Sequence, residues 1–189
     1  MMLMNLGLLL SLPTLMLAQA TLPEPLTPEQ KMKRRVLRLV EPVSIISTAI
    51  GAGFSQLQNE PQQWGQGMKG YARRFGSAEG YTAAHNFIAL GFDLTLHTDP
   101  RYHRLREGKF MPRMRNAISQ TFIANKDSGG KMVNVSEIGG TFGAAFVANA
   151  WEPTGHNTTG SALTRGTLGL AYHTLKNVAR EFLPDLAHP

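Results

Sequence analysis

The chain of 189 residues contains no cysteine. This absence excludes a disulfide framework, a thiol nucleophile, a cysteine-ligated metal and lipidation of a cysteine, so the stability of the fold must come from packing. The usual catalytic spacings are also missing: the sequence has no G-x-S-x-G, H-E-x-x-H, phosphate-loop or dinucleotide-loop pattern. The sequence therefore indicates no particular reaction, and it favours a structural or binding protein over an enzyme.

Charge is missing from the first 20 residues, which are rich in leucine and end in Ala18-Gln19-Ala20. A short apolar run with this small-x-small ending is typical of a secretory signal peptide, and the run is too short for a permanent membrane span. No Lys or Arg precedes the run, so an uncleaved N-terminal anchor is the alternative. We expect a signal peptide at 1–20, a proline-rich linker at 21–26 and a single helical domain at 27–189, located in the periplasm or bound peripherally to the envelope membrane.

Acidic residues are fewer than basic ones: the chain has 13 Asp and Glu and 19 Lys and Arg, which gives a formal net charge of +6. The predicted signal peptide is uncharged, so the whole excess belongs to the domain that follows it. An exported basic protein rarely meets nucleic acid, and we expect its partners to be anionic lipid, an envelope polymer or an acidic protein. The alternative is that the charge only aids solubility.

Strand-like alternation is scarce, and apolar residues recur at helical spacing instead. We expect an all-α fold, a bundle of six or seven short helices with Gly and Ala at the helix contacts. Thr27, Pro28 and Gln30 form the start signal of a basic first helix. Separate helices are expected at about 64–75 and 78–96, and the glycines at 65–70 leave the helix count open. The second helix carries an apolar stripe within a run too polar for a convincing membrane span: Val43, Ile46, Ile50, Gly53, Phe54 and Leu57.

Two later helices are expected to supply much of the core. Asn134 and Glu137 form a capping-box start for the first of them. Bulky and small residues each recur every four positions on opposite sides of this helix: Ile138, Phe142 and Phe146 against Gly140, Ala144 and Ala148. Such a helix is packed on both sides, and we interpret it as the central core helix. The last helix is expected to turn residues such as Leu168 and Leu175 toward the core and to end at Pro184.

Candidate metal ligands gather around the end of the helix at 78–96. At 100° per helical residue, Asp93 and His97 lie on nearly the same face, and His103, beyond the helix end, is expected to fold back to join them. Imidazole and carboxylate groups suit one divalent transition metal, which predicts a metal-assisted hydrolase of envelope lipid or polymer. The alternative is a solvated helix face. His85 points about 100° away and is expected to be a satisfied core histidine.

A basic, partly aromatic segment follows. Its candidate anion- and membrane-binding residues are Arg101, Tyr102, Arg104, Arg106, Lys109, Arg113 and Arg115. Arginine suits phosphate or carboxylate binding, and tyrosine suits a membrane interface. Together with the basic helix at 27–40, this segment predicts electrostatic docking on an anionic surface. The alternative is that the arginines pair internally with Asp93, Asp99 or Glu107.

Four short motifs lie between Gly51 and Phe182: Trp64-Gly65-Gln66-Gly67, Arg74-Phe75-Gly76, Asp99-Pro100-Arg101-Tyr102 and Asn149-Ala150-Trp151-Glu152-Pro153. In these motifs the chain resembles an uncharacterised family of exported bacterial proteins without assigned activity. The resemblance implies a location in the bacterial envelope, and it carries over no catalytic or binding residue.

The sequence as a whole thus predicts an exported envelope protein with a structural or binding role, held peripherally on an anionic membrane or polymer surface by its basic segments and needing no cofactor. The first alternative is the metal-assisted hydrolase with Asp93, His97 and His103. The second is a membrane-inserted helical protein, in which the small faces of the helices around Gly53 and Gly140 pack together within lipid.

Overall fold

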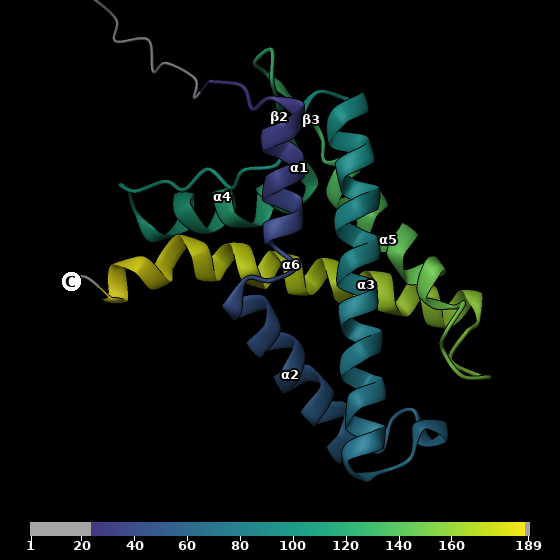
Figure 1. Ribbon diagram of the computed structural model, residues 1–189. Coiled ribbons are helices and arrows are strands. Elements are labelled where there is room, and N and C mark those ends of the chain that lie inside the picture. The colour runs from purple at the N-terminus through teal and green to yellow at the C-terminus, as the bar shows by residue number, and fades with distance from the viewer. Residues whose placement is uncertain (1–23, 188–189) are drawn as a thin grey trace, which may run out of the picture.

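The computed structural model describes residues 24–187, which form six α-helices, one short 3-10 helix and a small three-stranded sheet (Figure 1). The predicted signal peptide lies outside the described residues. The helical elements are α1 (Pro28–Leu37), α2 (Pro42–Leu57), η1 (Gln62–Trp64), α3 (Gly67–Thr95), α4 (Phe110–Phe122), α5 (Val135–Ala148) and α6 (Thr159–Ala187). The predicted all-α bundle is confirmed, but its helices are not all short, since α3 and α6 have 29 residues each.

α3 joins two segments that the sequence suggested as separate helices. The glycine-rich stretch does not unwind the middle of α3, because Gly65 and Gly67, both with positive φ, lie at or before its first residue. Gly80 lies inside the helix, where a Cβ atom would come within 3.3 Å of the Trp151 ring. Close packing of this ring offsets the cost of about 1 kcal/mol that glycine carries inside a helix. The described chain therefore has six α-helices.

The small sheet was missed by the sequence analysis. Its strands are β1 (Thr98–Asp99), β2 (Ile123–Lys126) and β3 (Lys131–Val133), all antiparallel and in that order. Thr98 pairs with Lys126, and Ile123 pairs with Val133. Strands of two to four residues are too short to show a clear alternation of apolar and polar side chains. Residues 127–130 form the loop of the β2–β3 hairpin.

α5 lies between α3 and α6, which run in different directions (Figure 1). On one side, a Cβ atom at Gly140 would come within 3.0 Å of Ala89 and His85 of α3. On the other side, the ring of Phe142 occupies the space beside Gly166 of α6. The prediction of a central helix packed on both faces is thus confirmed. Its small face meets α3, and not α2 as the membrane-inserted alternative assumed.

The interior of the described chain is polar, and its surface is rich in large apolar side chains. The buried hydrophobic residues are all alanines, whereas the largest fully buried side chains are Glu181, Thr98, Thr121, Thr141, Asp93 and Ser136. Leu168 and Leu175 of α6 are exposed, which corrects their predicted place in the core. α6 also continues past Pro184, which was expected to end it.

The apolar stripe of α2 faces solvent along its whole length. Its five large members are between 56% and 83% exposed: Val43, Ile46, Ile50, Phe54 and Leu57. We call these five residues the α2 apolar face. Large exposed apolar patches are uncommon on monomeric proteins and are often binding surfaces.

Within residues 24–187 no single helix is both long and apolar enough to cross a bilayer. α1 and α2 satisfy the requirement only as a pair, with a bend of 42° between them.

Candidate functional site

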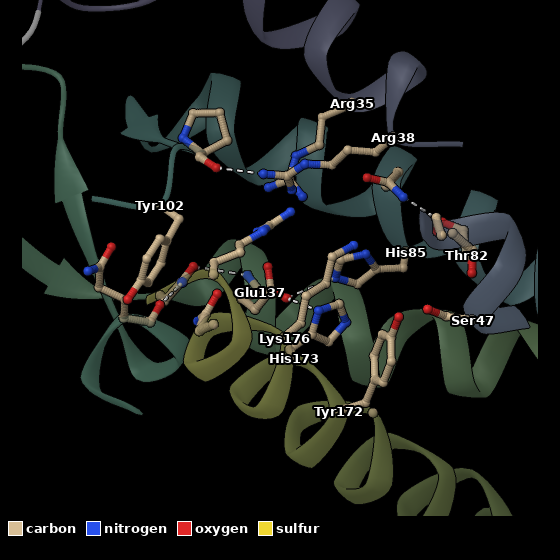
Figure 2. Close-up of a pocket in the computed structure, with 18 of the residues that line it drawn as sticks. Arg35, Arg38, Ser47, Thr82, His85, Tyr102, Glu137, Tyr172, His173 and Lys176 are labelled. Atoms are coloured by element: carbon tan, nitrogen blue, oxygen red, sulfur yellow. Dashed lines mark hydrogen bonds and ion pairs between the residues drawn. The ribbon is translucent and has the colours of Figure 1, made fainter. Parts of the chain in front are cut away.

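A pocket of about 510 Å³ opens among α1, α2, α3 and α6, with Glu137 of α5 in its wall (Figure 2). It exists because α2 packs against α3, whereas α6 packs against α4 and α5. Figure 1 shows α2 running away from α6. The polar side of α2 lines the pocket with Ser44, Ser47, Thr48 and Ser55. The volume falls in the range of pockets that hold small molecules.

α1 supplies cations to this region, because its basic side turns inward. Arg35 donates from Nε and Nη2 to Asp93 Oδ2 at 2.9 and 2.6 Å, and both side chains are buried. Lys31, also buried, forms an ion pair of 2.5 Å with Asp127. The apolar residues Met32 and Val36 are exposed instead. The charges of α1 therefore attach the helix to α3 and to the β2–β3 hairpin.

The predicted metal ligands Asp93, His97 and His103 are not brought together. Asp93 is committed to Arg35 and accepts a further hydrogen bond from Thr98. α3 ends at Thr95, and His97, with a φ of +52°, is exposed beyond that end. Nε2 of His103 lies 3.3 Å from Asp99. The helical spacing that linked Asp93 to His97 does not apply, because the helix stops between them.

Four of the seven basic-segment residues turn inward. Arg101 pairs with Asp99 at 2.7 Å. Tyr102 and Arg113 donate to the carboxylate of Glu181, and Arg104 donates to its backbone carbonyl. Glu181 is fully buried on α6. The internal alternative named the observed partner only for Arg101, which pairs with Asp99. The acceptor of the other three is Glu181, which sequence reasoning missed. The other three are exposed: Arg106, Lys109 and Arg115.

Glu181 has a pKa that reflects these contacts. Burial alone raises the pKa of a carboxyl group, because it penalises the charged form. The hydrogen bonds donated by Tyr102 and Arg113 outweigh this effect and hold the pKa of Glu181 below its ordinary value. Burial and the adjoining Glu181 carboxylate in turn raise the pKa of Tyr102. The carboxylate is therefore charged at neutral pH and serves as a structural acceptor.

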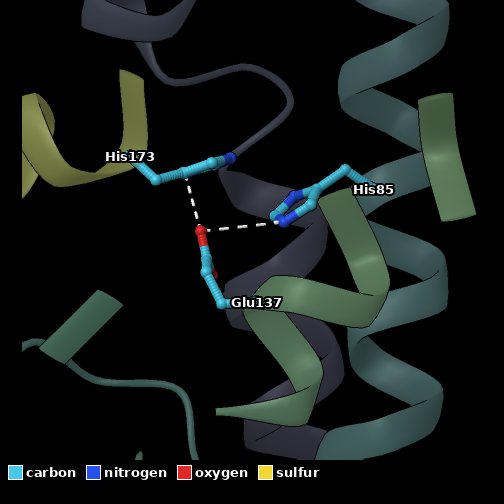
Figure 3. A group of neighbouring side chains, drawn as sticks. All are labelled: His85, Glu137 and His173. Atoms are coloured by element: carbon cyan, nitrogen blue, oxygen red, sulfur yellow. Dashed lines mark ion pairs between the residues drawn. The ribbon is translucent and has the colours of Figure 1, made fainter. Parts of the chain in front are cut away.

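His85, Glu137 and His173 meet at one edge of the pocket (Figure 3). Oε1 of Glu137 lies 2.7 Å from Nδ1 of His173 and 3.7 Å from Nε2 of His85. The two imidazole rings are stacked, with centroids 4.7 Å apart. Only half of the predicted capping box at Asn134 and Glu137 forms. The Asn134 side chain accepts from the Glu137 backbone N–H, while the Glu137 carboxylate turns to the histidines.

Burial lowers the pKa of His85 to about 3, so its imidazole is neutral at pH 7. Burial would by itself raise the pKa of Glu137, but the neighbouring His173, 2.7 Å away, outweighs it and brings the pKa well below the ordinary value. Glu137 is therefore a carboxylate. A neutral imidazole beside a carboxylate is a pair of good hydrogen-bond acceptors and metal ligands.

The pocket carries an excess of positive charge. Six cations line it (Arg35, Arg38, Arg101, Arg165, Lys176 and Arg180), against three carboxylates (Asp93, Asp99 and Glu137). Arg35 and Arg101 are matched by Asp93 and Asp99, and Arg165 contacts Glu152 and backbone carbonyls. The carboxylate of Glu137 faces His85 and His173.

Arg38 donates to the backbone carbonyl of Pro100 at 2.8 Å. Among the described residues, Arg38, Lys176 and Arg180 are nevertheless the pocket cations with the weakest compensation by carboxylates, and we call them the cationic trio. Burial and the neighbouring Arg35 lower the pKa of Arg38 to about 10. Burial and Arg180 lower the pKa of Lys176, whose nearest carboxylate, Glu41, is 3.9 Å away. Mutual repulsion of this kind is relieved when an anion binds.

Three buried polar atoms that belong to pocket residues have no hydrogen-bond partner among the described residues: Arg35 Nη1, His85 Nε2 and Asn86 Oδ1. An unsatisfied buried polar group costs about 1–3 kcal/mol. Their presence in one pocket favours a polar ligand over an apolar one. The pocket can thus hold an anionic molecule that also offers hydrogen-bonding groups.

Comparison with known proteins adds no precedent for this site. No protein-family model, no curated protein and no solved structure matches the chain. The function has to be argued from the pocket and the surface themselves.

Proposed function

We propose that this protein is an exported binding protein that rests on a membrane of the bacterial envelope and takes the anionic headgroup of a lipid into its pocket. The observation that carries this proposal is the two-sided character of α2. Its outer side is the α2 apolar face, and its inner side lines the pocket that holds the cationic trio. One helix therefore joins an apolar contact surface to an anion-binding cavity.

The chemistry of the pocket selects the headgroup. Arg38, Lys176 and Arg180 supply N–H donors on one side, and the serine and threonine hydroxyls of α2 supply donors on the other. Phosphate and carboxylate oxygens suit such donors, and arginine binds them in a bidentate manner. The exposed Arg106, Lys109 and Arg115 add long-range attraction toward an anionic surface. We therefore assign the contact with the membrane to α2 and the pocket. The basic segment has the smaller role of attracting the protein to the surface.

Replacing both Ile50 and Phe54 by Ser is expected to weaken binding to vesicles that contain phosphatidylglycerol by at least about tenfold. A fully buried large apolar side chain contributes about 1.5–3 kcal/mol, and each 1.4 kcal/mol is a factor of ten in affinity. Co-flotation with vesicles measures the effect. Val133→Ser is the matched control, because Val133 is similarly exposed but lies in β3. Equal binding by the double variant and the wild type would remove α2 from the interface.

The double substitution Lys176→Gln and Arg180→Gln is expected to weaken binding to anionic vesicles by about tenfold or more, since each basic residue near such a surface contributes about 1 kcal/mol. The dependence of binding on salt should also become flatter. Lys33→Gln with Lys69→Gln removes the same charge from exposed positions outside the pocket and serves as the control.

Soluble glycerol phosphate distinguishes two sources of the same anion. If it displaces the wild-type protein from vesicles at millimolar concentration, the pocket binds the free phosphate ester as well as the lipid. If the variant with Lys176→Gln and Arg180→Gln binds anionic vesicles as well as the control variant does, the pocket is not the anion site and the proposal fails.

A further inference from the structure

Three helices bring one potential ligand atom each to the same point. His85 comes from α3, Glu137 from α5 and His173 from α6, and their ligand atoms all lie within 4.8 Å of one another. Figure 3 shows both imidazole rings directed to the carboxylate of Glu137. Within residues 24–187 this is the one group of three or more such side chains close enough to share an ion.

The spacing suits a tetrahedral ion with short bonds. Bonds of about 2.0–2.2 Å from zinc to nitrogen and oxygen place neighbouring ligand atoms about 3.3 Å apart. The observed separations from Glu137 Oε1, 2.7 Å to His173 and 3.7 Å to His85, lie on either side of that value. The third separation, between the ligand nitrogens of His85 and His173, is within 4.8 Å.

A second observation concerns His85 alone. Its side chain is 5% exposed, and its Nε2 atom, which points to Glu137, has no hydrogen-bond partner among the described residues. The missing side chain of Gly140 leaves room for this ring, since a Cβ there would lie 3.0 Å from Cδ2 and 3.2 Å from Nε2. A buried nitrogen that is held in place and left unsatisfied is ready to donate its lone pair to an ion.

We propose that His85, Glu137 and His173 bind one divalent first-row transition metal, with Zn²⁺ as the preferred ion. Two histidines and one carboxylate are a ligand set typical of zinc sites that keep a fourth position open. Here the three residues line the pocket, so that position faces the cavity with the cationic trio. The metal group lies in the pocket of the proposed function and shares the unsatisfied His85 Nε2 with it, but its test uses Zn²⁺ alone and does not depend on membrane binding.

The test uses the mature protein without a histidine tag, stripped with chelator and then titrated with Zn²⁺ against a chromophoric chelator. The wild type is expected to bind one ion per chain. His173→Ala should weaken binding by more than the roughly 10–100-fold that loss of an outer-sphere partner costs. His97→Ala is the control, because His97 is an exposed histidine outside the group. With Co²⁺ in place of Zn²⁺, the visible absorption spectrum should change in His173→Ala and not in His97→Ala.

Two results overturn the proposal: no tighter binding by the wild type than by His173→Ala, or a loss of binding in His97→Ala alone. His173 is about one-fifth exposed, so its substitution is expected to keep the fold, which circular dichroism checks. If His173→Ala loses helix content, the isosteric variant Glu137→Gln takes its place. It must then bind Zn²⁺ more weakly than the wild type for the proposal to stand.

Discussion

Replacing Glu181 by Gln is expected to lower the free energy of unfolding by about 3–5 kcal/mol, the usual cost of removing one partner of a buried ion pair. Glu181 accepts hydrogen bonds from Tyr102, Arg113 and Asn116 side chains and from the Leu105 backbone. Neutral Gln cannot balance the charge of Arg113, and its amide group would oppose at least one donor. α6 would then keep only part of its side-chain hydrogen bonds to α4 and to the segment that precedes it.

Urea denaturation followed by circular dichroism measures this loss. Glu107→Gln is the matched control, because Glu107 lies in the same basic segment but is exposed. An exposed charge of this kind contributes at most about 1 kcal/mol. Similar midpoints for both variants would show that Glu181 has no special role in stability.

The same substitution should change the response to acid. The pKa of Glu181 is lower in the folded protein than its ordinary value of 4.5. Above pH 4.5 the carboxylate is charged in both states, and its favourable contacts stabilise the fold in full. As the pH falls from 4.5 through the lower folded pKa, the unfolded chain takes up protons first, and this part of the stability is lost. Glu181→Gln should therefore show a flatter decline in stability over that window than the wild type.

The helices of this fold could be predicted from local sequence because their signals are local. The capping box at Thr27 and Gln30 is present, with reciprocal hydrogen bonds of 3.2 and 2.9 Å. The small residues of α5 likewise predicted close helix packing, which the contact between Gly140 and α3 confirms. Helical periodicity and capping patterns each involve residues only a few positions apart, so a single segment of the sequence contains the whole signal.

Which side of each helix faces inward could not be predicted in the same way. Apolar stripes ordinarily mark the buried side of a helix. In this protein Lys31 and Arg35 of α1 are buried, and the α2 apolar face is exposed. Inward cations need acidic partners, and those partners, Asp127 and Asp93, lie 96 and 58 residues away in the sequence. Only the tertiary structure brings them together.

The candidate site was hidden from sequence analysis for a similar reason. His85, Glu137 and His173 belong to three different helices, so no short spacing connects them. The residues that did show a local spacing, Asp93 and His97, are separated by the end of α3. Local patterns favour ligand pairs on one helix, whereas this group depends on how α3, α5 and α6 pack.

Replacing Asp93 by Asn is expected to release α1 from the bundle and to cost about 3–5 kcal/mol, because Arg35 would stay buried without its counter-charge. α1 has ten residues, and an isolated helix of that length is marginal in water. Its backbone amides should therefore exchange faster with deuterium, while α5 stays protected. Arg34→Gln on the exposed side of α1 is the control and should leave exchange unchanged.

A double variant separates the charge from the packing at this position. Arg35→Met with Asp93→Leu removes both charges, and such replacements are often neutral or stabilising where a single removal is not. Protection of α1 from exchange should return in the double variant if the unpaired charge is what expels the helix.

Arg38 follows Arg35 by less than one turn of α1 and belongs to the cationic trio. Release of α1 in Asp93→Asn should therefore also weaken binding to anionic vesicles. If the backbone amides of α1 exchange at the same rate in Asp93→Asn as in the wild type, the ion pair of Lys31 and Asp127 is enough to hold the helix. The wall of the pocket would then not depend on the Arg35–Asp93 pair.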